Sequence, residues 1–366
     1  MIESKKVQKM LYGGDYNPEQ WPEEIWEEDM RLFHKAHIDV VTLNVFSWAA
    51  LQPDESTYDF SKLDKIMKLV KENGLKVCMA TSTGAHPAWM ARKYPDILRV
   101  EHNGMKRKFG ARHNSCPNSP NYRKYSAALV EKIAERYKDY DNIVAWHINN
   151  EFGGWCYCEN CEKAFRVWLQ KKYGTLDELN RVWNTAFWSH TMYDWDDVVA
   201  CNMLSEEFLW DGQIRTNFQG ISLDYNRFNS DSMLECFNIE KDVLKRITPD
   251  IPVTTNLMGA YKHLDYQKWA KDMDFISWDN YPAYDAVPGD AAMNHDLMRG
   301  LKQGKPFALM EQTPGVSNWH IYCKLKRPGV MRLWSYEAVA HGADTVMFFQ
   351  MRRSMGACEK YHSGVI

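Results

Sequence analysis

The chain has 366 residues, of which 45% are hydrophobic and 25% are charged, the composition of an ordinary globular protein. Its 45 Lys and Arg residues against 48 Asp and Glu residues give a net charge of -3, which favours neither nucleic acid nor an anionic membrane as a partner. No apolar run reaches the about 18 residues of a membrane span, and no secretory signal is recognisable. With nine scattered cysteines, the sequence predicts reduced thiols and a cytoplasmic location.

Short apolar or β-branched runs alternate with helical stretches along the chain. The runs predicted as buried strands are Leu11–Tyr16, Val40–Phe46, Lys76–Ser82, Ile143–Ile148, Pro252–Met258, Asp274–Trp278, Phe307–Met310 and Thr345–Gln350. The stretches with helical periodicity include Glu23–Ala36, Ser61–Asn73 with Gly74 as a stop, Tyr122–Asp139 and Ser335–His341. Eight buried strands separated by helices predict an α/β fold of the (β/α)8 TIM-barrel type, with a doubly wound sheet as the second possibility.

One interval is much longer than the others. About 100 residues separate the fourth predicted strand from the fifth, where a plain strand–helix–strand unit needs roughly thirty. We therefore predict an aromatic-rich insertion over about 155–235, at the end of the barrel where loops build the active site. The whole chain, 1–366, is predicted to form one barrel. After the eighth strand a closing helix is not predicted.

Two glutamates end predicted strands of this barrel. Glu151 follows the fourth strand and Glu311 follows the seventh, so both should point into the barrel mouth from opposite sides. A pair of carboxylates there suits glycoside hydrolysis, with one acting as acid and base and the other as nucleophile or base. The adjacent Asn150 can hold a substrate hydroxyl. The alternative is that each glutamate is a buried ion-pair partner.

Four cysteines predict a metal site. Cys156, Cys158 and Cys161 lie within six residues after the fourth strand, and Cys116 follows the third. Four thiolates from neighbouring loops form the tetrahedral set typical of structural zinc, which leaves no open position for a catalytic water. The alternative is a chance cluster without a metal.

Further residues are weaker candidates for sugar binding. Arg112 can donate to two hydroxyls, Tyr281 can support the nucleophile through its hydroxyl, and Glu359 and His362 can bind hydroxyls near the C-terminus. The tryptophans that could stack on a sugar face are Trp48, Trp89, Trp188 and Trp319. Each of these has an ordinary structural alternative: a salt bridge, a turn, core packing or a solvated end.

Together these motifs resemble glycoside hydrolase family 42 β-galactosidases. They are YGGDYNPEQWP near the start, ARHNSCP, WHINNEFGG with WCYCENC, FWSH, WDNYP, LMEQTPG with SNW, and the E-x-x-H tail, in that order along the chain. The resemblance implies a TIM barrel that hydrolyses terminal β-D-galactosyl residues with retention. It makes Glu151 the acid/base and Glu311 the nucleophile.

The resemblance also implies the surroundings of the two glutamates. Galactose would be held by Arg112, Asn150, Tyr281, Trp319, Glu359 and His362, with Trp188 lining the sugar site of its own or a neighbouring subunit. The four cysteines match the zinc cluster of some members. Members carry a second domain that builds a homotrimer and a small β domain, and we expect both to be absent here because the chain is shorter.

Two other functions stay open at this point. The first is a hydrolase of another specificity on the same barrel, such as an α-L-arabinopyranosidase or a β-1,4-mannanase-like enzyme, which pocket shape at the sugar's 6-hydroxyl would decide. The second, motivated by the expected truncation, is a remnant that binds carbohydrate without hydrolysing it. Small β-galactosides are the expected ligands in the main interpretation.

Overall fold

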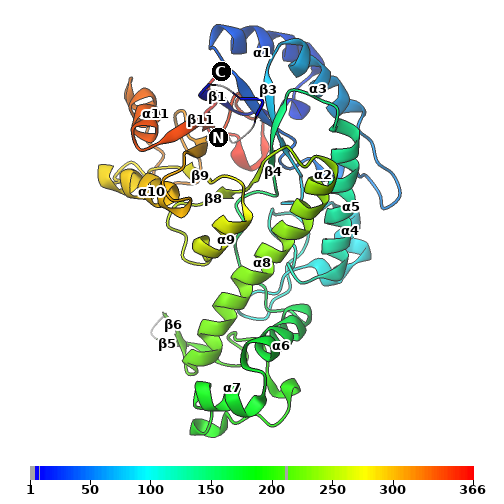
Figure 1. Ribbon diagram of the computed structural model, residues 1–366, viewed down its shortest axis with the longest axis vertical. Helices are drawn as coiled ribbons and strands as arrows, with labels where there is room; N and C mark the ends of the chain where they lie inside the picture. The colour runs from blue at the N-terminus through cyan, green and yellow to red at the C-terminus, as the bar shows by residue number, and fades with distance from the viewer. Residues whose placement is uncertain (1–4, 8, 211–212) are drawn as a thin grey trace.

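The computed structural model describes residues 5–7, 9–210 and 213–366, which form a barrel with one projecting arm (Figure 1). The strands of the barrel are β1 (Leu11–Asp15), β2 (Val40–Leu43), β3 (Lys76–Ala80), β4 (Ile143–His147), β7 (Val253–Thr254), β8 (Asn256–Leu257), β9 (Ser277–Asn280), β10 (Phe307–Gln312) and β11 (Ala343–Phe348). Their order in the sheet is β7-β4-β3-β2-β1-β11-β10-β9-β8, and all neighbours are parallel.

The sheet closes on itself through its fifth strand segment. β7 and β8 are separated only by Thr255, and they stand at the two ends of the strand order. One half of this segment pairs with β4 and the other half with β9, so the ring has no open edge at this point. This closure confirms the predicted TIM barrel and excludes the doubly wound sheet.

Apolar side chains from strands all around the ring fill the barrel interior. This inner cluster contains Leu11, Val40, Cys78, Val144, Ala145, Phe275, Ala308, Met310 and Met347. At the carboxyl ends of the strands the side chains become polar, as at Asp15 on β1 and Gln312 on β10. The packed interior therefore forms the floor of a polar site.

Helices cover the outside of the barrel with their apolar faces (Figure 1). They are α1 (Glu23–Lys35), α2 (Trp48–Leu51), α3 (Ser61–Glu72), α4 (Ala88–Lys93), α5 (Pro120–Tyr137), α9 (Tyr266–Asp272), α10 (Pro288–Leu301) and α11 (Val330–Ala340). The predicted stripe of α1 is buried at Trp26, Met30 and Phe33. Gly74, with φ of 72°, follows the end of α3 as the sequence predicts.

Several predicted boundaries differ from the structure, and the eighth strand is shifted to Ala343–Phe348. The sixth strand is Ser277–Asn280 rather than 274–278, because Asp274 turns toward the fifth strand and accepts a hydrogen bond from the Val253 amide. The seventh strand extends to Gln312. Helix α11 begins at Val330, five residues before the predicted Ser335, just after Gly329 with φ of 89° ends the preceding loop.

The predicted insertion forms the arm at the bottom of Figure 1. It contains α6 (Glu159–Tyr173), α7 (Leu176–Trp183), the antiparallel pair β5 (Glu207–Trp210) and β6 (Gln213–Thr216), and the first half of α8 (Gln219–Ile247). Tyr225 and Phe228 of α8 join the arm's own core, whereas Phe237 and Leu244 join the barrel core. One continuous helix therefore connects the arm rigidly to the barrel.

The segment after β11 contains no α-helix, in agreement with the sequence. Residues 349–366 include a short 3-10 helix, η5 (Ala357–Glu359), and then fold back on the barrel. The amide of Val365 donates to the Gln350 carbonyl over 3.0 Å, and the amide of Ile366 donates to Met351 over 2.9 Å. Among the helices of the described residues, none combines the length and the apolar character needed to cross a membrane.

Candidate active site

Three carboxylates meet at the carboxyl ends of the barrel strands. Glu151 follows β4, Asp279 lies on β9 and Glu311 lies on β10, and one oxygen of each is within 4.8 Å of one oxygen of each of the others. Asp279 and Glu311 are buried, and the Glu151 side chain is 11% exposed. The structure thus brings the two predicted glutamates together and adds a third acidic group.

Glu151 is held through both its backbone and its side chain. Its φ is 41°, and its amide donates to the Asn256 side-chain oxygen over 2.7 Å. Nη2 of Arg112 donates to Oε2 of Glu151 over 2.6 Å. This places the cation of Arg112 against the carboxylate, while the guanidinium also lies over the Phe46 ring at 5.7 Å.

Glu311 receives a hydrogen bond on each oxygen. The Tyr281 hydroxyl donates to Oε2, and the Asn256 amide nitrogen donates to Oε1 over 3.0 Å. Burial raises the pKa of the Glu311 carboxyl well above its usual range, and the nearby Asp15 and Glu151 raise it further. The Tyr281 hydroxyl and the Arg112 charge oppose that shift, because both stabilise the ionised form.

Asp279 is a buried group that sequence reasoning missed. Burial raises the pKa of its carboxyl well above the usual range, and the neighbouring Glu311 and Glu151 raise it further. Since like charges this close cannot all ionise, and Glu311 has a hydroxyl and a cation in its favour, the site favours ionisation of Glu311 over that of Asp279. The sequence feature that could have identified Asp279 is its position two residues before Tyr281, in the WDNYP motif at a strand end.

Asp15 and Asn256 are two further site residues that the sequence did not single out. Asp15 ends β1, and burial raises the pKa of its carboxyl to about 8. Asn256 opens β8 and lies between the two glutamates. The signal for Asp15 was its place at the end of a predicted strand, within the YGGDYNPEQWP motif, whereas Asn256 lies inside the fifth predicted strand and had no such signal.

The Asn256 side chain connects the catalytic candidates. Its oxygen accepts from the Glu151 amide, a group that can only donate, and this fixes the orientation of the side-chain amide. Its nitrogen then faces Asn150 Oδ1 at 3.0 Å, Asp279 Oδ2 at 2.6 Å and Glu311 Oε1 at 3.0 Å. The buried Asn256 side chain therefore fixes the backbone at Glu151 relative to the carboxylate of Glu311.

An aromatic cluster borders Glu311. The Tyr281 ring meets Trp319 edge to face at 4.7 Å, and Trp319 stacks on His362 at 4.7 Å. His362 Nε2 lies 2.7 Å from the Phe349 carbonyl, to which it donates, and burial lowers the pKa of His362 to about 4. The ring is therefore neutral, and because its Nδ1 is covered by protein, His362 can act on a ligand only through the Trp319 ring on which it stacks.

Glu359 belongs to the same mouth, whereas Trp188 does not. Burial raises the pKa of Glu359, the Arg112 charge opposes that shift and the Glu151 charge adds to it, so Glu359 is within electrostatic range of both groups. Trp188 lies in the arm on η3 (Phe187–Ser189), is 65% exposed and stacks on Phe187 at 5.7 Å. Its role in sugar binding stays a prediction.

Two other tryptophans considered from the sequence are core residues. Trp48 is fully buried and Trp89 is 7% exposed. The indole of Trp48 donates to the Gln52 side chain, and that of Trp89 to the Gln52 carbonyl, each over 2.9 Å. Their polar atoms are therefore satisfied within the protein, and their faces are covered.

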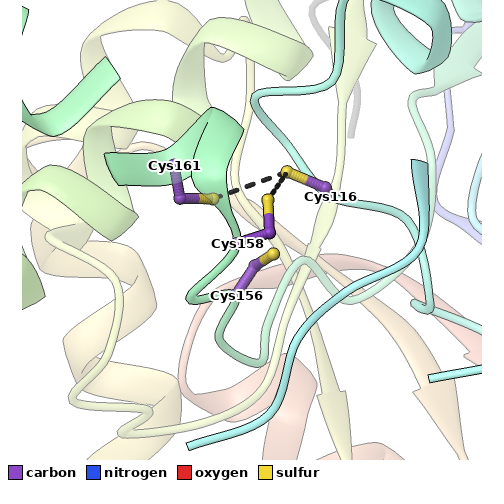
Figure 2. Close-up of side chains that lie close together, drawn as sticks. All are labelled: Cys116, Cys156, Cys158 and Cys161. Atoms are coloured by element: carbon purple, nitrogen blue, oxygen red, sulfur yellow. Dashed lines mark hydrogen bonds between the residues drawn. The ribbon is translucent and has the colours of Figure 1, made fainter. Parts of the chain in front are cut away.

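The four predicted cysteines converge at the junction of barrel and arm. Figure 2 shows Cys116 facing Cys158 and Cys161, with sulfur–sulfur distances of 3.4 Å, and Cys156 beside them. All four sulfurs lie within 4.8 Å of one another. A zinc tetrahedron with bonds of about 2.3 Å has sulfur–sulfur edges of about 3.8 Å, so the arrangement fits such an ion.

A closed barrel with two glutamates facing each other at strand ends is the arrangement typical of TIM-barrel glycoside hydrolases. The family model described as β-galactosidase, glycoside hydrolase family 42, matches residues 15–366. The chain belongs to this family.

Similar proteins agree with that assignment. BgaP, a β-galactosidase of Planococcus sp. (strain L4), is 62% identical over 362 residues, which are 99% of this chain and 53% of BgaP. The crystal structure of a β-galactosidase from Bacillus circulans sp. alkalophilus is 67% identical with a TM-score of 0.97, over 99% of this chain and 53% of that one. The structure of a cold-adapted β-galactosidase from Rahnella sp. R3 is 42% identical with a TM-score of 0.95, over 100% of this chain and 54% of that one. The chain therefore spans about half the length of these relatives.

Proposed function

We propose that this chain is the catalytic barrel, with its insertion over about 155–235, of a retaining β-galactosidase that removes terminal β-D-galactosyl residues from oligosaccharides. The observation that carries the proposal is the pair Glu151 and Glu311, whose nearest oxygens lie within 4.8 Å. Retaining glycosidases hold their carboxyl groups about 5–5.5 Å apart, and inverting ones about 6.5–9.5 Å. The family membership supports galactosides as substrates.

In this proposal the reaction has two steps. The ionised Glu311 attacks the anomeric carbon while Glu151 gives its proton to the glycosidic oxygen, so the leaving alcohol departs and a galactosyl ester of Glu311 forms. Glu151, now ionised, then takes a proton from a water molecule that attacks the same carbon and releases galactose. Arg112 stabilises the ionised Glu151 of the second step, because its guanidinium donates to that carboxylate.

The remaining site residues bind the sugar in this proposal. The Asn150 amide and Glu359 offer hydrogen bonds to hydroxyl groups, Trp319 offers a ring face beside Tyr281, and His362 supports that ring by stacking on it. Trp188 lies outside this mouth, so it can serve a sugar only in a neighbouring copy of the chain. That role requires an oligomer in which the arm of one copy meets the barrel of another.

We also propose that the four cysteines hold a structural zinc ion. Cys116, Cys156, Cys158 and Cys161 would supply its complete shell, and the ion would brace the loop that follows Glu151. A shell of four thiolates leaves no open position, so we assign it no catalytic step. The nine cysteines all lie among the described residues and none forms a disulfide, which suits the reducing cytoplasm as the location.

Hydrolysis of nitrophenyl β-D-galactoside by the purified chain tests this function. We expect turnover by the wild type and a loss of at least about 1,000-fold in Glu311→Gln, which removes the nucleophilic charge but keeps the shape. The α-L-arabinopyranoside, which lacks the 6-hydroxymethyl group, should be the slower substrate. A well-folded wild type without activity, or an unaffected Glu311→Gln variant, would contradict the proposal.

A further inference from the structure

A second cavity opens beside the carboxylate site. It measures about 340 Å³, and it shares Glu151 and Arg112 with that site. The loop after Glu151 supplies Gly154, Trp155 and Tyr157, and Tyr261 also lines the cavity. Pockets for small ligands begin at about 300 Å³, so this cavity has the size for one compact polar molecule.

One part of the wall of this cavity is aromatic, and much of the rest is charged or polar, with Arg99, Glu101, His102, Arg107 and Arg112. Trp155 stacks on Tyr157, with ring centres 6.4 Å apart, and makes a T-shaped contact with His263 at 5.0 Å. Tyr261 meets the same histidine at 4.9 Å. A flat apolar ring with a polar edge matches the face of a sugar, whose C–H groups can rest on it while its hydroxyls reach polar neighbours.

The backbone on both sides of Trp155 is fixed. Gly154 has φ of 77°, and a Cβ there would lie 2.2 Å from Nη1 of Arg99, so only glycine allows this approach. The buried Arg99 guanidinium donates to the Gly153 carbonyl over 2.8 Å. On the other side, the Tyr225 hydroxyl donates to the Cys156 carbonyl over 2.7 Å. Trp155 is thus a preorganised platform next to the cysteine cluster.

The position of the smaller cavity relative to Glu151 and Glu311 indicates which part of the substrate it binds. The acid must stand beside the leaving oxygen, so the leaving group occupies space next to Glu151. A larger cavity of about 1,400 Å³ also reaches Glu151, but it runs along α10 and α11 and is lined by Asp279 and Tyr281, the groups around Glu311. The smaller cavity instead contains Arg112, the partner of Glu151.

We propose that the cavity between Arg112, Trp155 and Tyr261 binds the leaving sugar of the substrate, with the Trp155 ring as its platform. The proposal rests on the galactosidase function proposed above. It identifies the substrate class as galactosides joined to a second sugar ring. The cysteine cluster would then contribute to substrate specificity by holding Trp155 in place, since Trp155 directly precedes Cys156.

Binding of two non-hydrolysable ligands tests this proposal. Titration calorimetry would compare methyl β-D-thiogalactoside with a sulfur-linked galactosyl-glucose disaccharide, using the wild type, Trp155→Ala, Trp155→Phe and Tyr284→Ala. Tyr284 lines the larger cavity and serves as the matched control. Turnover of β-D-galactosyl fluoride, whose leaving group has no ring, measures the galactosyl site separately in each variant.

We expect the wild type to prefer the disaccharide. Trp155→Ala should weaken disaccharide binding about tenfold, the effect of losing one central aromatic contact, and leave methyl thiogalactoside within about twofold. Trp155→Phe should restore most of the preference. Equal binding of both ligands by the wild type would overturn the cavity assignment, as would a preference lost in Tyr284→Ala but kept in Trp155→Ala. Failure of the wild type to bind either ligand or to cleave the fluoride would overturn the galactosidase function as well.

Discussion

In the proposed mechanism, the hydroxyl of Tyr281 sets the pH range in which Glu311 can act as nucleophile. Tyr281→Phe removes that oxygen and keeps the ring, so Glu311 loses the donor on Oε2 and retains only Asn256 on Oε1. A hydrogen bond to a charged acceptor contributes about 1.5–3 kcal/mol, and Glu311 is too buried for water to replace it. At 1.36 kcal/mol per pKa unit, this corresponds to a rise of about 1–2 units in the pKa of Glu311.

The direction of the shift in the pKa of Glu311 follows from the form of the carboxyl group that the Tyr281 hydroxyl stabilises. Tyr281 donates to the ionised carboxylate, so its removal favours the protonated form, and activity then requires a higher pH. The acidic limb of the pH profile of kcat/KM should move upward by about 1–2 units in Tyr281→Phe. Tyr284→Phe removes the same atom from an exposed ring that packs on Tyr322, and should leave the limb in place. An unmoved acidic limb in Tyr281→Phe would refute this account of the nucleophile.

Three further predictions concern the amide bridge, the cysteines and the arm. Asn256→Ala should lower kcat/KM about 100-fold or more, because it removes hydrogen bonds to both glutamates and each tenfold loss of rate corresponds to about 1.36 kcal/mol of activation free energy. A decrease of less than tenfold in a folded variant would contradict the bridging role. Cys161→Ser should abolish the zinc content measured by plasma emission, and a metal-free wild type would exclude the zinc site. Phe165→Ala should cost about 3–5 kcal/mol in urea unfolding, since this buried ring packs on Tyr225 and Phe228; a loss under about 1 kcal/mol would contradict its place in the arm's core.

The barrel and its two glutamates were predictable because both depend on local patterns. Alternating buried runs set the strands, and a parallel barrel brings the carboxyl ends of all strands to one face. Glu151 and Glu311 could therefore be paired although 160 residues separate them. The cysteine cluster was predictable for the same reason, because Cys116 and Cys156 follow adjacent strands.

The remaining site residues depend on contacts that no local pattern reveals. Asn256 stands inside a predicted apolar strand, and its partners Glu151 and Glu311 lie 105 and 55 residues away. The burial of Asp279 and Asp15 results from barrel closure, and their raised pKa values follow from that burial. The position of Trp188 depends on how the arm folds, and the sequence alone does not place it near the carboxylates.

Trapping the reaction intermediate tests the central claim most directly. A 2-deoxy-2-fluoro-galactosyl fluoride should form its ester with the nucleophile quickly and lose it slowly, so the adduct can be seen by intact-protein mass spectrometry. Peptide mapping should find one galactosyl group per chain, attached to the carboxylate of Glu311. An adduct on Glu151 or Asp279, or rapid hydrolysis of galactosides without any trapped ester, would contradict the account.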